Sequence, residues 1–317
     1  MSSIGNNIAE AAGILSNGGI VGIPTETVYG LAANAFDAAA VVKIFEAKKR
    51  PFFDPLIVHT NSIARITEFV DEVPELAVTL YQKFAPGPLT ILLKKYAEKI
   101  PDIVTAGLDT VAVRIPNHPL TLQLLSSLPF PLAAPSANPF GYVSPTTAEH
   151  VNEQLGAEVP YVLDGGPCDV GIESTIISIE GNRIIVHRLG GITIDDLKAF
   201  ATHVELRISS SSNPVAPGTL ESHYAPNKKV YFEDNYPAGF AFANTGYIGF
   251  NNPHADIKSV NQIMLSTQGN LAEAAHNLFA ALRSMDKLNV DTILVARFPQ
   301  QGLGLAINDR LARAVAR

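Results

Sequence analysis

The sequence predicts an α/β protein in which a twisted mixed-sheet domain is followed by a smaller α/β domain. Short apolar runs of strand length alternate with amphipathic helical runs over the first two-thirds of the chain. A hairpin signal at residues 175–189, with Glu180-Gly181-Asn182 at its turn, places antiparallel strands among them. A hairpin within strand–helix alternation favours a mixed sheet over a purely parallel one.

The periodicity of the first part defines its helices and strands in order. We expect helices at residues 8–15, 38–47, 74–84, 120–128 and 147–155. We expect strands at residues 19–23, 55–59, 89–93, 110–115, 131–134 and 161–163, before the hairpin. Between the first strand and the second helix, the segment Pro24-Thr25-Glu26-Thr27-Val28-Tyr29-Gly30-Leu31 is expected to form a polar turn closed by glycine.

A serine run at residues 209–212 interrupts the alternation, which restarts at Lys229. The restarted part predicts strands at residues 230–232, 247–250 and 292–296, and helices at residues 271–288 and from residue 303 onward. A chain of 317 residues is expected to hold roughly two domains. We therefore expect a catalytic domain at residues 1–206, a Pro/Ser-rich linker at residues 207–228 and a small α/β accessory domain at residues 229–317.

The composition is that of an ordinary globular protein in a reducing compartment. Hydrophobic residues make up 47% of the chain and charged residues 17%. The net charge of −7 argues against a broad, non-specific grip on nucleic acid. Cys168 is the single cysteine, which excludes an internal disulfide framework. The sequence has no apolar run of roughly 18 residues and no signal peptide, so we expect a cytoplasmic protein without a membrane partner.

Familiar nucleotide and metal motifs are missing from the sequence, so bound phosphates would have to be held by cationic side chains. There is no Gly-x-x-x-x-Gly-Lys-Ser/Thr loop, no Gly-x-Gly-x-x-Gly fingerprint and no zinc spacing. Lys48, Lys49 and Arg50 end a predicted helix and precede Pro51. The three cations repel one another, and a bound anion would relieve that repulsion. Compensation of the helix dipole explains the same residues about equally well.

Hydroxyl and amide side chains follow the strand predicted at residues 131–134. Ser136 and Asn138 lie between two prolines, and Ser144 lies just before the next predicted helix. Hydroxyls beside a helix N-terminus bind phosphate well. In isolation, however, such a turn more often caps its own backbone groups.

The strand predicted at residues 110–115 places Thr110, Ala112 and Arg114 on one face. An arginine at the end of a face of small residues suits bidentate binding of a carboxylate, although a solvated face is an equally good interpretation. Arg188, at the end of the hairpin, raises the same alternatives. For His59, at the end of a strand, a satisfied core histidine is the better interpretation.

These motifs belong to an ordered series along the chain. The series runs through Pro24-Thr25-Glu26-Thr27-Val28-Tyr29-Gly30-Leu31, Lys48-x-Arg50-Pro51, Pro55-Leu56-Ile57-Val58-His59, Pro86-Gly87-Pro88-Leu89-Thr90, Val113-Arg114-Ile115-Pro116, Ala134-Pro135-Ser136-Ala137-Asn138 and Glu173-Ser174-Thr175. It resembles the YrdC-like threonylcarbamoyl-AMP synthases over residues 4 to about 200. Segments 216–226 and 302–311 resemble the long, two-domain form of that family. The resemblance implies a twisted mixed-sheet YrdC-like domain followed by a smaller Rossmann-like α/β domain.

The resemblance also implies a reaction, in which L-threonine, bicarbonate and ATP give threonylcarbamoyl-AMP and diphosphate. The product serves the threonylcarbamoyladenosine modification of tRNA, so a tRNA threonylcarbamoyl transferase complex is an implied downstream partner, together with a weak contact with tRNA. The residues matched as catalytic are Lys48, Arg50, Ser136 and Asn138. Those matched to ATP are Lys48, Phe52, Thr110, Ser136, Ser144, Arg188 and Tyr224. Those matched to threonine are Thr25, His59, Arg114, Ala134 and Ser174.

The implied chemistry fits a site that is rich in Lys, Arg, Ser and Asn. The threonine amine captures carbon dioxide or bicarbonate as a carbamate, and a carbamate oxygen attacks the α-phosphate. Because that nucleophile is already an anion, catalysis reduces to positioning and charge stabilisation. Mg²⁺ is expected to arrive with ATP, held mainly by phosphates and water, with no protein metal site and no prosthetic group.

Two further expectations concern the linker and an alternative function. Residues 214–226 are stiffened by proline and carry His223 and Tyr224, so we expect them to fold over the filled site as a lid. The alternative function is an RNA-binding module in translation or ribosome maturation, with the cleft at residues 48–50 holding an RNA backbone. The acidic net charge and the sparse aromatics near that cleft argue against it.

Overall fold

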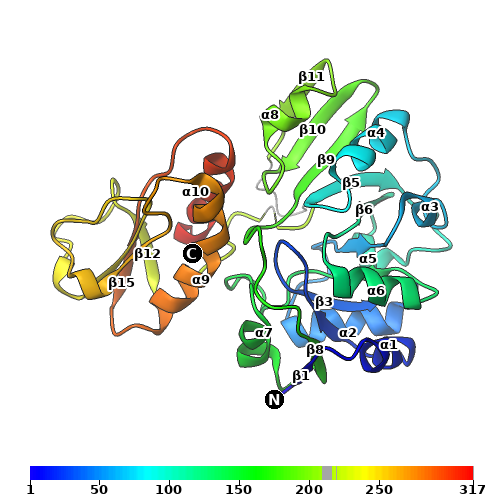
Figure 1. Cartoon of the computed structure of the whole chain (residues 1–317), viewed down its shortest axis with the longest axis horizontal. Coiled ribbons are helices and arrows are strands. Elements are labelled where there is room, and N and C mark those ends of the chain that lie inside the picture. The colour runs from blue at the N-terminus through cyan, green and yellow to red at the C-terminus, as the bar shows by residue number, and fades with distance from the viewer. Residues whose placement is uncertain (209–215, 219, 317) are drawn as a thin grey trace.

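The computed structural model describes residues 1–208, 216–218 and 220–316, which form two sheets of different size (Figure 1). The serine run at residues 209–212 lies outside the described residues. The large sheet belongs to the first part of the chain and the small sheet to the second part. The α/β fold class expected from the sequence is confirmed.

The large sheet has eleven strands in the order β1-β8-β2-β3-β7-β4-β6-β5-β9-β10-β11. The strands are β1 (Ser3–Gly5), β2 (Val21–Ile23), β3 (Gly30–Asn34), β4 (Ile57–His59), β5 (Leu89–Lys94), β6 (Thr110–Arg114), β7 (Leu132–Ala133), β8 (Tyr161–Leu163), β9 (Thr175–Glu180), β10 (Arg183–Arg188) and β11 (His203–Leu206). The sheet contains both parallel pairs, such as β4 with β6, and antiparallel pairs, such as β5 with β6. The sheet is mixed, as the hairpin signal predicted.

Five helices of the first part begin and end within one residue of the expected positions, and three short helices were not expected. They are α1 (Ile8–Ser16), α2 (Ala38–Lys48), α3 (Ile63–Ile66), α4 (Glu75–Phe84), α5 (Asp102–Thr105), α6 (Pro119–Ser127), α7 (Ala148–Leu155) and α8 (Ile194–Lys198). Asp37 caps α2 by accepting hydrogen bonds from two backbone N–H groups, and Thr147 caps α7 through His150 N–H. The sequence did not predict β3, because its Gly-Leu-Ala-Ala-Asn run has little intrinsic preference for a strand. Pairing with β2 and β7 makes it one.

The central strands bury one face and carry polar groups at the end of the other. Val58, Ile91 and Val113 lie on the buried face, in the main core. The opposite face carries Ile57 and Ala112, on which Ala216 of the linker packs. This face is therefore covered by the linker, and it leads to the C-terminal ends of β4 and β6.

A β-bulge in β10 changes the direction of its last side chain. Val186 pairs with Ile177 and Arg188 pairs with Ile176, so one extra residue, His187, is accommodated between them. Regular alternation would put Arg188 on the same face as Val186, which lies in the core. The bulge instead turns Arg188 to the face that Ala216 covers.

The small sheet is four-stranded and entirely parallel, in the order β12-β15-β13-β14. Its strands are β12 (Lys229–Phe232), β13 (Thr245–Gly249), β14 (Gln262–Met264) and β15 (Thr292–Val295). The helices of this part are α9 (Leu271–Lys287) and α10 (Leu303–Val315), with two short 3₁₀ turns, η1 (Phe242–Asn244) and η2 (Ser259–Asn261). Within the described ranges, none of the helices is long and apolar enough to cross a membrane.

Helices α9 and α10 lie on the side of the small sheet that faces the first domain (Figure 1). Asp286 of α9 accepts hydrogen bonds from the Tyr142 hydroxyl at 2.7 Å, from the Asn227 amide at 2.9 Å and from the Lys228 backbone N–H at 3.0 Å. One carboxylate thus joins a loop of the first domain to the end of the linker. Arg283, one turn earlier, donates to the carbonyls of Val143 and Ser144.

Asp286→Ala should loosen this domain contact, because three donors lose their acceptor at once. We expect the free energy of unfolding to fall by about 1–3 kcal/mol, measured by urea titration with tyrosine fluorescence. Asp256→Ala, which changes an exposed acid of the same domain, is the control and should shift stability by less than about 0.5 kcal/mol. Equal stabilities of the two variants would contradict the role given to Asp286.

Candidate active site

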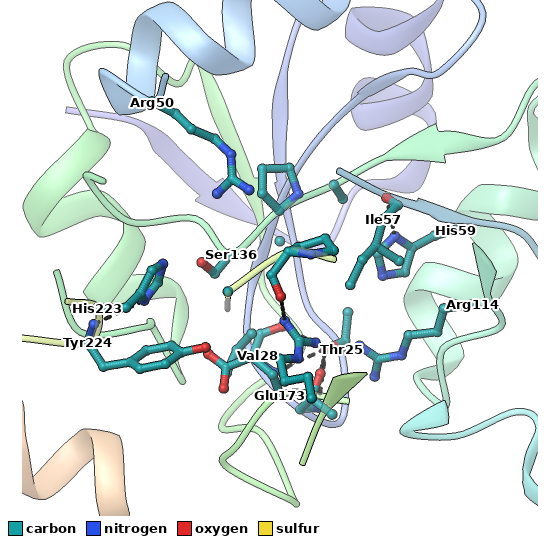
Figure 2. Close-up of a pocket in the computed structure, with 17 residues that line it drawn as sticks. Thr25, Val28, Arg50, Ile57, His59, Arg114, Ser136, Glu173, His223 and Tyr224 are labelled. Atoms are coloured by element: carbon teal, nitrogen blue, oxygen red, sulfur yellow. Dashed lines mark hydrogen bonds between the residues drawn. The ribbon is translucent and has the colours of Figure 1, made fainter. Parts of the chain in front are cut away.

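A cavity lies where the C-terminal ends of β4 and β6 meet the polar turn, the 134–136 segment and the linker (Figure 2). Its lining residues are Thr25, Thr27, Val28, Gly30, Arg50, Ile57, His59, Arg114, Ala134, Pro135, Ser136, Glu173, Arg188, Pro217, Gly218, His223 and Tyr224. Only about 40 Å³ inside it is open to water-sized molecules. That space suits a few waters, not a nucleotide.

Arg50 reaches the cavity from the loop after α2 and is almost fully buried. Its Nε donates to the Asp54 carbonyl at 3.2 Å and its Nη2 donates to the Pro55 carbonyl at 2.9 Å. The Asp54 carboxylate lies 2.8 Å from Nη2. Burial lowers the pKa of Arg50, and the Asp54 carboxylate opposes that shift. The local loop thus satisfies the side of the guanidinium that faces away from the cavity.

Arg114 and Arg188 enter from two other strands of the sheet. Arg114 ends β6, lies 2.8 Å from the Glu26 carboxylate and donates to the Gly87 carbonyl at 3.3 Å. Arg188 ends β10 and donates to the Ser174 carbonyl and to the Pro217 carbonyl, each at 3.0 Å. Burial lowers the pKa of Arg188 to about 10, which still leaves it charged at neutral pH. Three buried arginines therefore converge on one small space.

Lys48 lies behind the cavity and fixes the turn that carries Ser136 and Asn138. Its Nζ donates to the backbone carbonyls of both residues. Burial, and then the charge of Arg50, lower the pKa of Lys48 well below its ordinary value. The Asn138 amide donates to the carbonyls of Pro139 and Tyr142, each at 2.8 Å. The structure thus brings all four residues matched as catalytic together, with Arg50 and Ser136 lining the cavity itself.

Thr25, His59 and Ala134, matched to threonine, all line the cavity with Arg114. The Thr25 hydroxyl donates to the Val28 carbonyl at 2.6 Å, which holds the polar turn closed. Burial, and then the charge of Arg114, lower the pKa of His59 to about 3. His59 is therefore a neutral, buried ring that also contacts the cavity. The sequence left open whether His59 is a core histidine or a residue of the binding site, and the two interpretations are compatible.

Besides Lys48 and Asn138, four of the expected site residues do not line the cavity. Phe52 is 58% exposed and packs on Phe45, with ring centroids 5.0 Å apart. Thr110 begins β6, on the far side of Ala112, where it lines a separate hollow that also contains Leu92 and Ser178. Ser144 and Ser174 are fully buried one layer behind the lining.

Ser174 and Ser144 instead support residues that do line the cavity. The Ser174 hydroxyl accepts a hydrogen bond from Arg188 at 3.1 Å, and the Ser144 hydroxyl donates to Glu173 at 2.7 Å. Glu173 and His223 line the cavity, although the sequence assigned them no role. Their position in the sequence could have identified them, because Glu173 directly precedes the matched residue Ser174 and His223 directly precedes the matched residue Tyr224.

His223 and Tyr224 of the linker close the cavity on the side of the second domain (Figure 2). Burial, and then the charges of Arg50 and Lys48, lower the pKa of His223 well below its ordinary value, so it is neutral. The Tyr224 ring stacks on Phe279 of α9, with centroids 5.4 Å apart. The described part of the chain holds no group of three His, Cys, Asp or Glu side chains that could bind a metal ion.

Comparison with known proteins shows what this architecture is similar to. A family model described as "Telomere recombination", which covers Sua5, YciO and YrdC, matches residues 13–190. A second, described as "Threonylcarbamoyl-AMP synthase, C-terminal domain", matches residues 192–316. The threonylcarbamoyl-AMP synthase of Bacillus subtilis (strain 168) is 39% identical, over 97% of this chain and 92% of the relative. That of Schizosaccharomyces pombe is 34% identical, over 98% and 88%.

Solved structures agree with these matches. The crystal structure of P. abyssi Sua5 complexed with L-threonine superposes with a TM-score of 0.89 at 36% identity, covering 99% of this chain and 97% of that one. The E. coli YciO structure, at 23% identity and a TM-score of 0.54, covers 63% of this chain and all of its own, and shares the fold. Both domains are thus matched in sequence and the full chain in structure. The chain belongs to the threonylcarbamoyl-AMP synthase family, and it is an enzyme of the nucleotidyltransferase type.

Proposed function

We propose that the cavity of Figure 2 is where this chain makes threonylcarbamoyl-AMP from L-threonine, bicarbonate and ATP, for the modification of tRNA. The observation that carries the proposal is the convergence of Arg50, Arg114 and Arg188 on one buried space. Arg50 and Arg114 are each paired with one carboxylate, whereas Arg188 donates to neutral oxygens, and a buried guanidinium group with neutral partners is costly unless it serves an anionic ligand. The RNA-binding alternative is not favoured, because such a module would need an open basic surface.

The proposed roles follow from the segments that carry each cation, which are two strand ends for Arg114 and Arg188 and the end of α2 with its following loop for Lys48 and Arg50. We assign Arg114 to the threonine carboxylate, with Thr25, His59, Ala134 and Ser174 on the same side. We assign Arg50 and Arg188 to the phosphates of ATP, with Lys48 holding the Ser136–Asn138 turn in place. The carbamate oxygen then attacks the α-phosphorus, the bond from that phosphorus to the bridging oxygen breaks, and diphosphate leaves with its electron pair. Fixed positive charge stabilises the negative charge that shifts to the leaving oxygens.

Mg²⁺ would assist this step by neutralising the diphosphate, and it would be held by phosphates and water, since Glu173 is the sole carboxylate among the described lining residues. We propose the tRNA threonylcarbamoyl transferase complex as the consumer of the product. The weak tRNA contact and the cytoplasmic location remain predictions.

The linker is proposed to act as a lid that opens to admit ATP. Pro217, Gly218, His223 and Tyr224 fill the cavity so far that a nucleotide cannot enter while they stay. Withdrawal of Ala216 would also expose the sheet face between Arg114 and Thr110, where the sequence expects an ATP contact. A linker that closed over both substrates, farther from the sheet than it lies here, would then exclude water from a hydrolysable adenylate. The domain division at residues 1–206, 207–228 and 229–317 is part of this proposal.

Arg50→Ala should abolish most turnover, because it removes charge that faces the reacting phosphates. We expect a loss of about 3 kcal/mol or more in transition-state stabilisation, measured as threonine-dependent formation of threonylcarbamoyl-AMP by mass spectrometry. Lys48→Ala should behave similarly. Arg50→Lys should also have low activity, because a lysine ammonium group is a point charge and cannot replace the planar, bidentate guanidinium group. Lys49→Gln, which removes an adjacent exposed cation, is the control and should stay active. Near-normal activity of Arg50→Ala would refute the pocket assignment.

Arg114→Ala should raise the KM for threonine far more than the KM for ATP, because the lost fork holds a carboxylate. We expect an increase of roughly tenfold or more for threonine. Arg188→Ala is the reciprocal comparison, with the larger change in the KM for ATP. If Arg114→Ala weakened ATP and left threonine unchanged, the two assignments would be reversed.

Protease cleavage within residues 214–226 should slow when ATP and threonine are both present, because a closed lid is a poor substrate. Cleavage would be followed by mass spectrometry, with the exposed loop at residues 251–256 as the internal control. Tyr224→Ala should reduce synthesis or release the adenylate to hydrolysis. An unchanged cleavage rate, with full activity of Tyr224→Ala, would leave the linker as a passive spacer.

A further inference from the structure

A carboxylate lines a cavity that otherwise gathers cations. Among the described lining residues, Glu173 is the only acid, and its side chain is almost fully buried. A bare carboxylate at this position would repel a triphosphate and a carbamate, since like charges in a poorly solvated space interact strongly. The position therefore demands a counter-charge.

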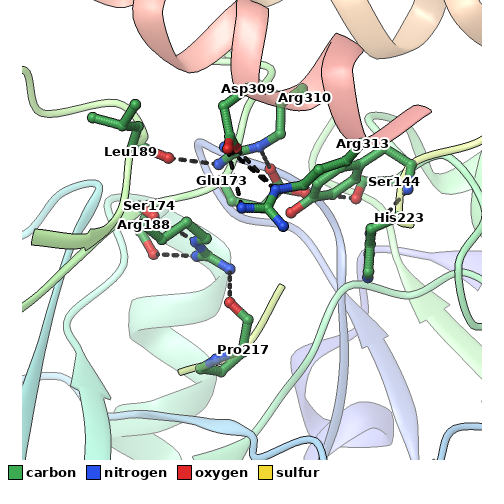
Figure 3. A network of polar contacts seen from close by, with 11 residues as sticks. Ser144, Glu173, Ser174, Arg188, Leu189, Pro217, His223, Asp309, Arg310 and Arg313 are labelled. Atoms are coloured by element: carbon green, nitrogen blue, oxygen red, sulfur yellow. Dashed lines mark hydrogen bonds and ion pairs between the residues drawn. The ribbon is translucent and has the colours of Figure 1, made fainter. Parts of the chain in front are cut away.

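The charge of Arg188 acts on Glu173 from the first domain, but the direct ion-pair partner of Glu173 comes from the other domain. Arg310 of α10 donates from Nε to Glu173 Oε2 at 2.9 Å, while the Ser144 hydroxyl donates to Oε1 at 2.7 Å (Figure 3). Arg310 is 0% exposed, so the pair is shielded from solvent. The two residues are 137 positions apart in the chain and meet only because the domains dock.

Arg310 is held in place from several sides. Its Nη2 donates to the Leu189 carbonyl at 2.7 Å and its Nη1 donates to Asp309 Oδ2, also at 2.7 Å. The guanidinium carbon lies 5.2 Å from the centroid of the Tyr224 ring. Burial by itself lowers the pKa of Arg310, but attraction to Tyr224, Glu173 and Asp309 outweighs burial, and the pKa lies above its ordinary value. Arg310 thus stays charged beside the cavity.

A second arginine of α10 grips the linker next to this contact. Arg313 donates to the Leu220 carbonyl, and its own backbone carbonyl accepts a hydrogen bond from His223 N–H at 3.2 Å. Figure 3 shows both arginines descending from α10, with Arg310 beside Glu173. One helix of the second domain therefore contacts a lining residue and the linker that closes the cavity.

The geometry points to Arg310 as a positioning residue of the active site, which neutralises Glu173 and makes the cavity ready for anionic substrates only while the C-terminal domain is docked. Stability alone does not explain a charged pair at this position, because a buried ion pair contributes little net stability and can be replaced by neutral residues. The inference rests on the proposed use of ATP in this cavity. It gives the second domain a defined part in the reaction that the first domain carries out.

The test is equilibrium binding of a non-hydrolysable ATP analogue to the unaltered chain and to four full-length variants. Arg310→Gln leaves Glu173 unpaired and should weaken binding roughly thirtyfold or more. The double variant Arg310→Gln/Glu173→Gln removes both charges and should return to within roughly threefold of the unaltered chain. Arg310→Lys keeps the charge and should bind better than Arg310→Gln. Arg297→Gln, an exposed arginine of the same domain that pairs with Asp234, is the control and should bind normally.

Circular dichroism and thermal melting of each variant separate loss of binding from loss of fold. Weak binding by an Arg310→Gln variant that melts at the temperature of the unaltered chain, followed by rescue in the double variant, supports neutralisation, since a merely structural role for Arg310 would weaken binding only together with stability. Unchanged binding in Arg310→Gln, or a folded double variant that binds as weakly as the single one, would overturn the inference. If Arg310→Gln does not fold, near-normal binding by a folded double variant and by Arg310→Lys supports the inference. Weak binding by a folded double variant then overturns it. Absence of ATP binding by the unaltered chain would instead refute the proposed function.

Discussion

Several cations buried around one small cavity form the constraint on which the rest of this structure depends. A guanidinium removed from water stays charged only when its donors find partners. Arg50 finds them in its own loop, Arg114 in the carboxylate of the polar turn, and Arg188 in backbone carbonyls of the Ser174 segment and the linker. Loop, turn, hairpin and linker must all be in place together. The buried charges of the site are therefore stabilised only when the tertiary structure has formed.

The mixed sheet is what lets these segments meet. Parallel pairing of β4 with β6 puts His59 and Arg114 at neighbouring strand ends, on the edge where open α/β sheets bind ligands. The bulge in β10 adds Arg188 to the same face, which regular alternation would have turned into the core. Lys48, at the end of α2, fixes the Ser136 turn from behind the cavity. A site assembled from strand ends and side chains has no need of a glycine-rich phosphate loop.

The proposed chemistry explains why the site contains charged and hydroxyl groups but assigns no proton transfer to its histidines. A carbamate is already a nucleophile, so the proposed reaction asks the protein for orientation and for stabilisation of phosphate charge. His59 and His223, held neutral by burial and by nearby cations, fill space without adding charge. Glu173 is the exception to a cationic lining, and its pairing with Arg310 ties the second domain to the site.

The sequence by itself determined the longer helices, most strands of the sheets and the ordered motif series, because helical periodicity, turn residues and caps act over a few positions. It placed Lys48 at the end of α2 and Arg114 at the end of β6 correctly, and Arg50 lies two residues beyond α2. Only the tertiary structure decided that β3 is a strand, that Arg188 leaves the core face, and that Thr110 lies on the far side of Ala216. The tertiary structure also decided that Arg310 is the partner of Glu173, since Arg310 lies 137 residues away in another domain. Contacts of that kind depend on strand order, register and domain docking, which local patterns do not encode.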